Sequence, residues 1–388
     1  MSQIISTEDK KLLTIKEVSE LLNTSYSTLR RWDESWKLES IRIWTTHRKY
    51  NLDDIQKVIN SNYKEEKSNN KFKFIDLFAW IGGFHVAFHN LWWKCVSSCE
   101  IDKNARNTYE FNFKPKNKEL FDNWYFFEDV TKLKGDEVLD HDILCWWFPC
   151  QAFSIAWNQK WFEDDRWNLF FDVARIVKKK KPKVVFLENV KNLTSHDKWN
   201  TFNVILDTLK NLWYHVKFQV LNTYEYWNVP QNRERIYIVW FKDKKSYNNF
   251  EFPWKINLDK KITDLLEKNV ENTFYYNWKS LYDRIKDDVT NKNTAYQWRR
   301  QYVRENKKWL VPTLTANMWT WWHNVPIILV DDWIRKLTPK ECIRFQWYPE
   351  DYKFPSISNW QQYKQAWNSV SVPVIQRIWE NIIKSLWI

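Results

Sequence analysis

Between residues 72 and 241, short apolar runs of strand length alternate with longer stretches of helical periodicity. The runs are Lys73–Phe78, Cys95–Cys99, Ile143–Cys145, Val184–Leu187, Val216–Leu221 and Ile236–Phe241. Such runs are typical of buried strands, and strand–helix alternation predicts a parallel sheet in an α/β fold. The carboxyl ends of parallel strands meet at one edge of a sheet, where ligands bind. The residues that follow these runs are therefore predicted to share a site.

The segment before this sheet has a different pattern. Apolar residues at helical spacing begin at Ile15, and a second short helix is expected over about Ser27–Asp33. Two short strands, 41–43 and 48–50, and a closing helix from Leu52 to Ile59 complete a small unit. Residues 61–71 are polar and aperiodic, which is typical of a linker.

Residues 242–332 depart from the sheet pattern and are aromatic and basic. Ile334–Tyr348 is predicted to be helical, and Gln365–Trp387 to carry a final amphipathic helix. The expected domains are therefore 1–60, 72–241 and 242–332, with residues 333–388 returning to the second. No apolar run approaches the roughly 18 residues of a membrane span, so no membrane association is expected.

The charge balance favours a nucleic-acid partner. The chain of 388 residues has a formal net charge of +12, and a basic protein attracts polyanions, although many solvated surfaces are also basic. Its 5 cysteines are scattered and form no paired metal-ligand cluster. We therefore expect no metal site and a reducing, cytoplasmic location.

One feature of the composition is anomalous. The chain has 3 Gly and 29 Trp, and 29 of 388 is close to the usual glycine content of about 7%. Adjacent tryptophans such as Trp146-Trp147 and Trp321-Trp322 stand where turns are expected, and glycines suit turns. Our hypothesis is that most of these residues are glycine in the natural protein, through a codon such as UGA that its source reads as glycine. Trp32, on the apolar side of a helix, is an expected exception.

Candidate cofactor residues follow the first strands. The turn after the first strand reads FAWIGG, and glycines there allow a ligand to approach a helix N-terminus closely. Glu100-Ile101-Asp102 follows the second strand, where an acid is placed to bind ribose hydroxyls. Asp129-Val130 occupies a similar place for an adenine. Each signal is weak alone, since acids at strand ends are often merely solvated.

Candidate catalytic residues follow the later strands. Cys150 comes directly after Pro149, which fixes the backbone, with Gln151 and Ser154 as nearby hydrogen-bonding groups. The alternative for a lone cysteine is a buried structural role. Glu188 ends another buried strand at the same edge, where partial burial raises a carboxyl pKa and suits a proton donor. Arg233 and Arg235 share one face by their spacing, with phosphate or surface contact as the alternative.

The order of these motifs resembles one known family. FAxIGG, ExD, PCQ, ENV and QxRxR, with the longer strings FPCQAFS, PQNRERIY and YKQAWNSV, are similar to bacterial cytosine-5 DNA methyltransferases of the HhaI type. The resemblance covers Phe72 to Ile388, about four-fifths of the chain. It implies a Rossmann-like methyltransferase sheet with a smaller target-recognition domain. It also implies a DNA (cytosine-5-)-methyltransferase, EC 2.1.1.37, of a restriction–modification system, with double-stranded DNA and a cognate endonuclease as partners.

The resemblance also implies residue roles. Cys150 is the nucleophile, Glu188 holds and protonates the cytosine ring at nitrogen 3, Arg235 reaches the ring's carbonyl oxygen, and Arg233 helps to hold that corner. The expected S-adenosyl-L-methionine site comprises Phe78, Trp80 (as glycine), Ile81, Gly82, Gly83, Glu100, Ile101, Asp129, Val130, Pro149, Asn368, Ser369 and Val370.

The N-terminal unit resembles a second family. The string TIKEVSELLNTSYSTLRRW is similar to the winged helix-turn-helix of MerR-type regulators and excisionases, whose second helix enters the major groove. Arg30, Arg31 and Arg48 are then expected to contact DNA, although a packing module is the alternative. Two other functions remain open: a DNA-binding regulator with an inactive methyltransferase part, and a tRNA cytosine-5 methyltransferase.

Overall fold

The chain forms two compact units, residues 1–71 and 72–388. This computed structural model describes residues 12–21, 26, 29, 33, 38, 40–43, 47–51, 54–55, 72–89, 93–147, 165–299, 301–314 and 326–387. Each unit is considered by itself. In the described residues, no helix is long and apolar enough to span a membrane.

The N-terminal unit is a small helical and sheet module. Its three strands β1 (Leu12–Thr14), β2 (Ile41–Ile43) and β3 (His47–Asn51) are antiparallel in the order β1-β3-β2. Helix α1 (Ile15–Leu21) begins where Glu17 and Thr14 cap each other, because the Glu17 carboxylate accepts the Thr14 backbone N–H at 2.7 Å. The predicted pairing of the two short strands is confirmed, whereas β1 was not predicted.

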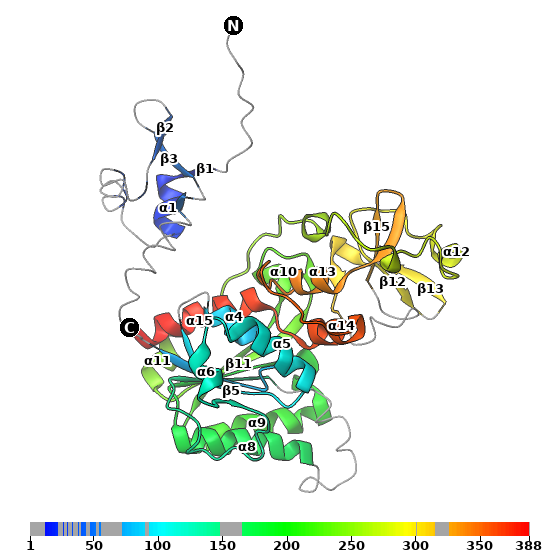
Figure 1. The fold of residues 1–388 in the computed structure, drawn as a ribbon. Helices are drawn as coiled ribbons and strands as arrows, with labels where there is room; N and C mark the ends of the chain where they lie inside the picture. The colour runs from blue at the N-terminus through cyan, green and yellow to red at the C-terminus, as the bar shows by residue number, and fades with distance from the viewer. Residues whose placement is uncertain are drawn as a thin grey trace. The chain divides into compact units, whose positions relative to one another are not determined.

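A seven-stranded sheet forms the centre of the larger unit (Figure 1). Its strand order is β6-β5-β4-β7-β8-β11-β9. The strands are β4 (Lys73–Leu77), β5 (Lys94–Cys99), β6 (Phe126–Phe127), β7 (Ile143–Trp147), β8 (Val184–Val190), β9 (His215–Asn222) and β11 (Glu234–Phe241). The first five are parallel, and β11 runs antiparallel to both β8 and β9. The six predicted strands are confirmed, but the sheet is mixed rather than wholly parallel as predicted, because β11 runs antiparallel to both of its neighbours.

Helices cover both faces of this sheet. Helices α8 (Asp165–Lys180) and α9 (Asn200–Lys210) pack on one face, where they share a core with Leu144 and Ile238. Helices α4 (Gly83–His89), α5 (Lys103–Phe113) and α15 (Val372–Trp387) pack on the other. The chain proceeds outward in both directions from β4, so a crevice is expected at the strand ends between β4 and β7.

A smaller antiparallel sheet lies beside this layered unit. It has the order β13-β12-β15-β16, formed by Tyr302–Glu305, Tyr296–Arg299, Pro326–Val330 and Trp333–Lys336. Its core includes Tyr276, Leu281 and Ile327. Strand β10 (Gln231–Asn232) pairs in parallel with β14 (Val311–Pro312) and so joins this region to the strand β11.

The remaining described helices of the larger unit are short. They are α6 (Lys118–Asp122), α10 (Thr223–Tyr226), α11 (Lys244–Asn249), α12 (Tyr282–Ile285), α13 (Pro339–Arg344) and α14 (Asn359–Asn368), with 3-10 turns at 191–194, 196–199, 262–265, 272–274 and 307–309.

Two predicted helices differ from the structure. Ile334–Tyr348 begins as strand β16, and helix α13 starts only at Pro339, because Thr338 and Glu341 form a capping box there. The final stretch is two helices, α14 and α15, separated by residues 369–371. Pro373 stands in the first turn of α15, where its missing N–H costs nothing.

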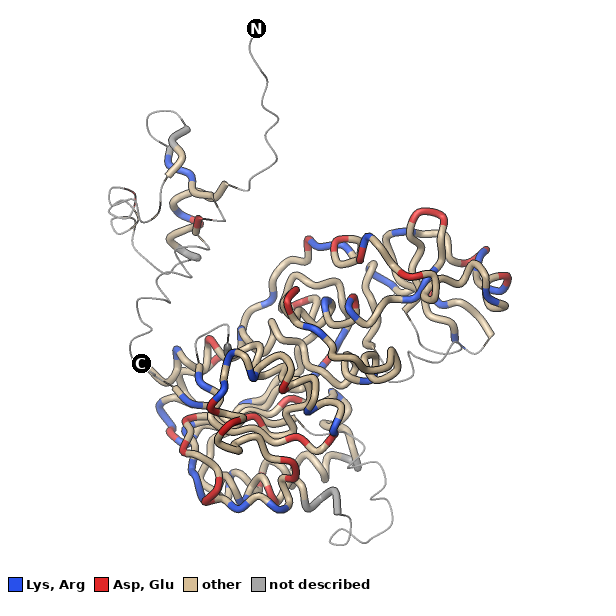
Figure 2. The backbone as a smooth tube through the Cα atoms, in the orientation of Figure 1, with Lys and Arg blue, Asp and Glu red and all other residues tan. Residues whose placement is uncertain are grey.

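The lysine run at the end of α8 is neutralised locally. Lys179 contacts Asp136 at 2.8 Å, and Lys180 contacts Asp140 at 2.9 Å. Figure 2 shows basic and acidic positions interspersed over the tube of the larger unit. The lysines at this helix end therefore lie at the surface beside acidic residues.

Candidate active site

The turn after β4 has an unusual backbone. Phe78, Trp80 and Gly82 have φ values of 57°, 50° and 81°, in the left-handed region that favours glycine. A Cβ atom on Gly83 would lie 2.3 Å from the Val370 Cγ2 atom. The turn therefore lies against the segment between α14 and α15, and the predicted cofactor residues Ile81 and Val370 are both buried beside it.

Glu100 organises the neighbouring strand end. One carboxylate oxygen accepts the Trp80 backbone N–H at 2.9 Å, and the other accepts the Asp102 backbone N–H at 2.8 Å. Burial raises the pKa of Glu100, although these backbone N–H groups act against the rise. A carboxylate can accept about four hydrogen bonds, so Glu100 both fixes the turn and retains the capacity to accept a hydroxyl hydrogen bond.

The other predicted cofactor residues lie around the same strand ends. Ile101 is 72% exposed, an unusual position for an isoleucine, and it offers an apolar surface beside Glu100. Asp129 accepts hydrogen bonds from the Thr131 backbone and hydroxyl at 3.0 and 2.7 Å, and Val130 is buried.

Sequence reasoning missed an ion pair at this edge. Lys364 on α14 contacts Asp102 at 2.8 Å, and Asp102 also caps α5. Partial burial raises the pKa of Asp102, but the hydrogen bonds from Lys364 and from the backbone N–H groups of Ala105 and Asn104, together with the charge of Lys364, outweigh it and lower this pKa. No local pattern marks this pair, since the two residues are far apart in the chain.

Arg233 holds the C-terminal segment in place. Its guanidinium donates to the carbonyl oxygens of Ser369 and, at 3.5 Å, Trp367. The Ser369 hydroxyl is 2.5 Å from that of Tyr348, a residue that sequence reasoning also missed. Asn368 lies between these two anchored carbonyls and is half-buried. Burial lowers the pKa of Arg233 to about 9. The surface alternative for Arg233 is therefore wrong.

Glu188 on strand β8 and Arg235 on strand β11 face each other. Glu188 is fully buried, and its carboxylate lies 3.2 Å from the Arg235 Nε atom. Neither oxygen accepts a hydrogen bond from the described residues. Burial raises the pKa of Glu188, while Arg235 and Arg233 oppose the rise. A buried carboxyl without hydrogen-bond donors is suited to hold a proton and present it to a ligand.

Cys150 itself lies outside the described residues, as do Pro149, Gln151 and Ser154. The strand that leads to it is described: Trp147, three residues earlier, pairs with Glu188 in the parallel register of β7 and β8. The other four cysteines (Cys95, Cys99, Cys145 and Cys342) are buried. Burial raises the pKa of Cys95 to about 12, so it is an unreactive thiol.

Comparison with known proteins identifies this arrangement. Residues 72–384 match the model of the C-5 cytosine-specific DNA methylases, and residues 13–59 that of the MerR HTH family regulatory proteins. The chain belongs to the C-5 cytosine-specific DNA methylase family. It is 48% identical over 316 residues to the type II methyltransferase M.Bsp6I of Bacillus sp. (strain RFL6), covering 80% of this chain and 98% of that one.

Two further relatives and one solved structure extend the comparison. The type II methyltransferase M.HhaI of Haemophilus parahaemolyticus is 40% identical over 83% of this chain and 97% of its own. M1.ScrFI of Lactococcus lactis subsp. cremoris is 35% identical over 98% of this chain and 95% of its own. The crystal structure of the S. pombe Dnmt2 methyltransferase has the same fold, with a TM-score of 0.62 and 16% identity over 82% of this chain and 99% of that one.

The expectation of a DNA (cytosine-5-)-methyltransferase is thus confirmed, together with its α/β fold. Members of this family take the methyl group from S-adenosyl-L-methionine. Across the described part of the chain, no group of His, Cys, Asp and Glu residues is arranged to hold a metal ion.

Proposed function

We propose that this chain transfers a methyl group from S-adenosyl-L-methionine to carbon 5 of cytosine in a specific DNA sequence, as part of a restriction–modification system. The observation that carries the proposal is the buried Glu188 beside Arg235, which accepts no hydrogen bond from the described residues and lies on the strand that pairs with the one leading to Cys150. A cognate endonuclease is the corresponding partner.

The chemistry follows from these side chains. Carbon 5 of cytosine is a weak nucleophile, so the Cys150 thiolate first adds to carbon 6 while Glu188 gives a proton to nitrogen 3. The ring becomes an enamine, whose electron pair at carbon 5 takes the methyl group. A base then takes the proton from carbon 5, the bond between sulfur and carbon 6 breaks to release the thiolate, and nitrogen 3 returns its proton to Glu188. Arg235 holds the ring's carbonyl oxygen, and the base must first leave the duplex stack.

The cofactor fits the described strand ends. Phe78–Gly83 would lie along it, Glu100 would accept its ribose hydroxyls, and Ile101, Asp129 and Val130 would contact its adenine. The segment Asn368–Val370 would close the site, held by Arg233. When bound, S-adenosyl-L-methionine supplies an electrophilic methyl group on sulfur.

The parts of the chain divide the work. Residues 72–241 with 333–388 carry catalysis, and residues 242–332 read the target DNA sequence, with Gln151 and Ser154 near the base.

Residues 1–60 bind DNA through Arg30, Arg31 and Arg48, and the linker 61–71 joins them to the rest of the chain. Arg30 and Arg31 lie outside the described residues, and Arg48 contacts Asp33 at 3.0 Å. M1.ScrFI aligns with nearly the whole chain, so a methyltransferase relative shares the N-terminal unit. We propose that this unit regulates transcription of the operon that encodes the chain. Specific promoter binding should disappear on deletion of residues 1–60.

One experiment tests the activity and its nucleophile. The full chain, made with glycine at the tryptophan positions where the family has glycine, is incubated with tritiated S-adenosyl-L-methionine and with separate samples of unmethylated duplex DNA and tRNA, beside a Cys150→Ala control. We expect label in DNA only, absent from the control. Promoter binding without label would support a regulator with an inactive catalytic part, and label only in tRNA would overturn the DNA substrate.

We also propose that most tryptophans of this sequence are glycine in the natural protein. Ten described non-glycine residues have positive φ, and six of them are tryptophan: Trp80, Trp124, Trp199, Trp213, Trp309 and Trp347. Positive φ suits glycine and strains a residue with a bulky side chain. Several of these indoles are also exposed, including Trp124 at 85% and Trp213 at 86%. Trp32 lies outside the described residues.

Peptide mass spectrometry of the protein from its native source tests this proposal. Peptides that contain positions 80, 147 and 213 should have the mass of glycine at those positions. Intact tryptophan there would contradict the proposal, whatever the activity of the enzyme.

A further inference from the structure

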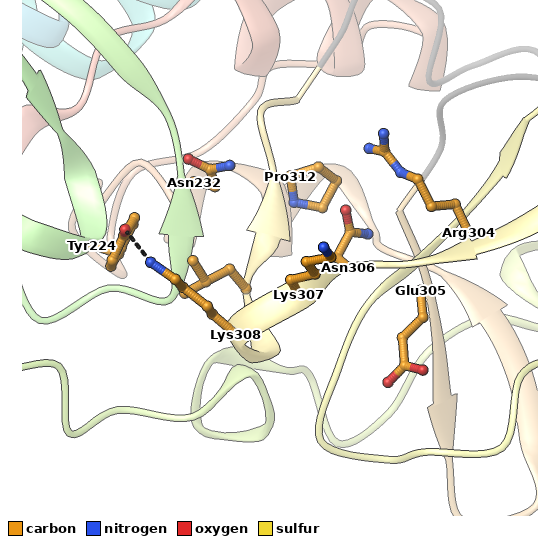
Figure 3. Close-up of a pocket in the computed structure, with 9 residues that line it drawn as sticks. Tyr224, Asn232, Arg304, Glu305, Asn306, Lys307, Lys308 and Pro312 are labelled. Atoms are coloured by element: carbon orange, nitrogen blue, oxygen red, sulfur yellow. Dashed lines mark hydrogen bonds between the residues drawn. The ribbon is translucent and has the colours of Figure 1, made fainter.

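A basic pocket lies where the strand segment before β11 meets the smaller sheet (Figure 3). Its volume is about 380 Å³. One side of the pocket belongs to the part of the larger unit that contains the seven-stranded sheet. The other side belongs to the small antiparallel sheet and the turn that follows β13. The lining residues are Tyr224 and Asn232 on the first side, and Arg304, Glu305, Asn306, Lys307, Lys308, Leu310 and Pro312 on the second.

The charge of this pocket favours an anion. Arg304, Lys307 and Lys308 are all exposed. Glu305 extends in the opposite direction from the Arg304 guanidinium, because adjacent residues of a strand project to opposite faces. Among the described residues, neither Lys307 nor Lys308 forms an ion pair with an acid. Positive charge gathered in a concave site attracts a negatively charged ligand.

Lys308 is held in a defined position across the pocket. Its Nζ atom donates to the Tyr224 hydroxyl at 3.1 Å and lies 5.3 Å from the centre of the Tyr224 ring. A φ of 61° turns the backbone sharply at Lys308 and allows the side chain to reach that wall. An ammonium group held in this way loses less freedom when it binds a ligand.

The pocket is connected to the catalytic arginines through the backbone. Asn232 lines the pocket and directly precedes Arg233. Strand β10 pairs with β14 in the register Gln231↔Val311, and the Thr313 hydroxyl donates to the Asn232 carbonyl at 2.7 Å. A ligand in this pocket therefore contacts the segment that sets the position of Arg235.

We propose that this pocket binds a backbone phosphate of the substrate duplex, and that Lys307 and Lys308 are positioning residues that align the target strand with Arg235. The inference rests on the proposed function, since it takes duplex DNA as the substrate. Phosphate contacts fix the register of a protein on DNA without reading sequence. The target sequence would accordingly be read elsewhere in residues 242–332.

The test uses the salt dependence of DNA binding by the full chain. Kd for duplex DNA is measured over a series of salt concentrations for the unmodified chain, Lys307→Gln, Lys308→Gln and the double variant. Loss of one phosphate contact should reduce the slope of log Kd against log salt by about 0.9. Lys286→Gln is the matched control, because Lys286 pairs with Asp283 on α12 and does not line the pocket. Lys308→Arg should restore the slope.

Each outcome decides between the possibilities. If Lys286→Gln lowers the slope as much as the pocket variants do, or if none of these variants changes the slope, the phosphate site is overturned. A slope that falls with tRNA but not with duplex DNA would mean that the pocket serves RNA. If the slope depends on the lysines and the unmodified chain transfers no methyl group, the proposed activity fails while the phosphate site stands. If the unmodified chain transfers methyl groups but the pocket variants leave the slope unchanged, the proposed activity stands and the phosphate site fails.

Discussion

The larger unit contains two buried pairs of glutamate and arginine that differ in how fully they are satisfied. Arg335 and Glu341 meet through two parallel hydrogen bonds of 2.8 and 2.7 Å, and both side chains are fully buried. The Glu341 carboxylate also accepts the backbone N–H groups of Thr338 and Glu267, each at 2.8 Å. Glu188 has one arginine contact at 3.2 Å and no hydrogen bond from the described residues.

The difference separates a structural pair from a functional one. Glu341 joins α13, strand β16 and the segment around Glu267, so its hydrogen bonds hold these three backbone segments together. Glu188 is buried at a cost, because burial without hydrogen bonds disfavours a charge. A protein retains such a group where a ligand completes its hydrogen bonds. In the proposed function, nitrogen 3 of cytosine is the group that completes the hydrogen bonds of Glu188.

The largest expected effect comes from Glu188→Gln. The glutamine keeps the shape but loses the proton that nitrogen 3 requires, so kcat should fall by about 10²- to 10⁴-fold. Stability should be unchanged or higher, because no charge remains to be buried. Rates of tritium transfer and thermal unfolding measure the two effects. If Glu188→Gln lowered the unfolding temperature while the folded protein kept full activity, Glu188 would be a structural residue like Glu341.

The opposite result is expected for Glu341→Gln. Breaking a buried pair leaves Arg335 uncompensated and should lower the free energy of unfolding by about 3–5 kcal/mol. The double variant Arg335→Met with Glu341→Leu should recover much of that loss, since apolar residues often replace such pairs well. Denaturant unfolding measures both changes. If the single and double variants were equally unstable, the ion pair would not be the source of the stability.

The pH dependence of stability sharpens the comparison further. The folded pKa of Glu188 is raised from 4.5 by burial, so the folded state binds its proton more tightly than the unfolded state. The resulting stability is fully present below pH 4.5 and is lost as pH rises through the folded pKa. Methyl transfer should weaken over the same range. Parallel stability curves for the unmodified chain and Glu188→Gln would show that Glu188 does not titrate in this way.

The smallest effect is expected at a third, partly exposed pair. Asp102 and Lys364 contact each other at 2.8 Å with side chains 22% and 30% exposed. Solvent screens such a pair, so Lys364→Gln should cost no more than about 1 kcal/mol of unfolding free energy. Its dissociation constant for S-adenosyl-L-methionine should rise by less than about fivefold. A much larger rise would mean that Lys364 contacts the cofactor directly.

The sequence predicted the strand ends better than the long-range contacts. Glu188 follows an all-apolar run and was predicted at the sheet edge, whereas Arg235 precedes another run and its place in the site came from the family resemblance. The partners of Arg233 were not predictable, because the carbonyl oxygens of Trp367 and Ser369 lie more than 130 residues away. The pair of Arg335 and Glu341 was hidden in a predicted helix, although Thr338 and Pro339 carried the signal of a helix start.

The tryptophan positions show a second limit. Residue patterns suggested that Trp80 belongs to a glycine-rich turn, but only the backbone showed that its φ of 50° is positive, as are those of Phe78 and Gly82, two residues away on either side. Such alternation cannot be predicted from hydrophobic spacing, because it depends on how closely the turn approaches Val370.

The most direct test of the central claim is covalent capture on duplex DNA. Once bisulfite sequencing has located the target, 5-fluorocytosine replaces that cytosine, and fluorine at carbon 5 prevents the final loss of a proton. With S-adenosyl-L-methionine present, we predict a methylated nucleotide bound to the Cys150 peptide in the unmodified chain and in folded Glu341→Gln, and almost none in Glu188→Gln. An adduct on another residue, or full capture by Glu188→Gln, would contradict the account.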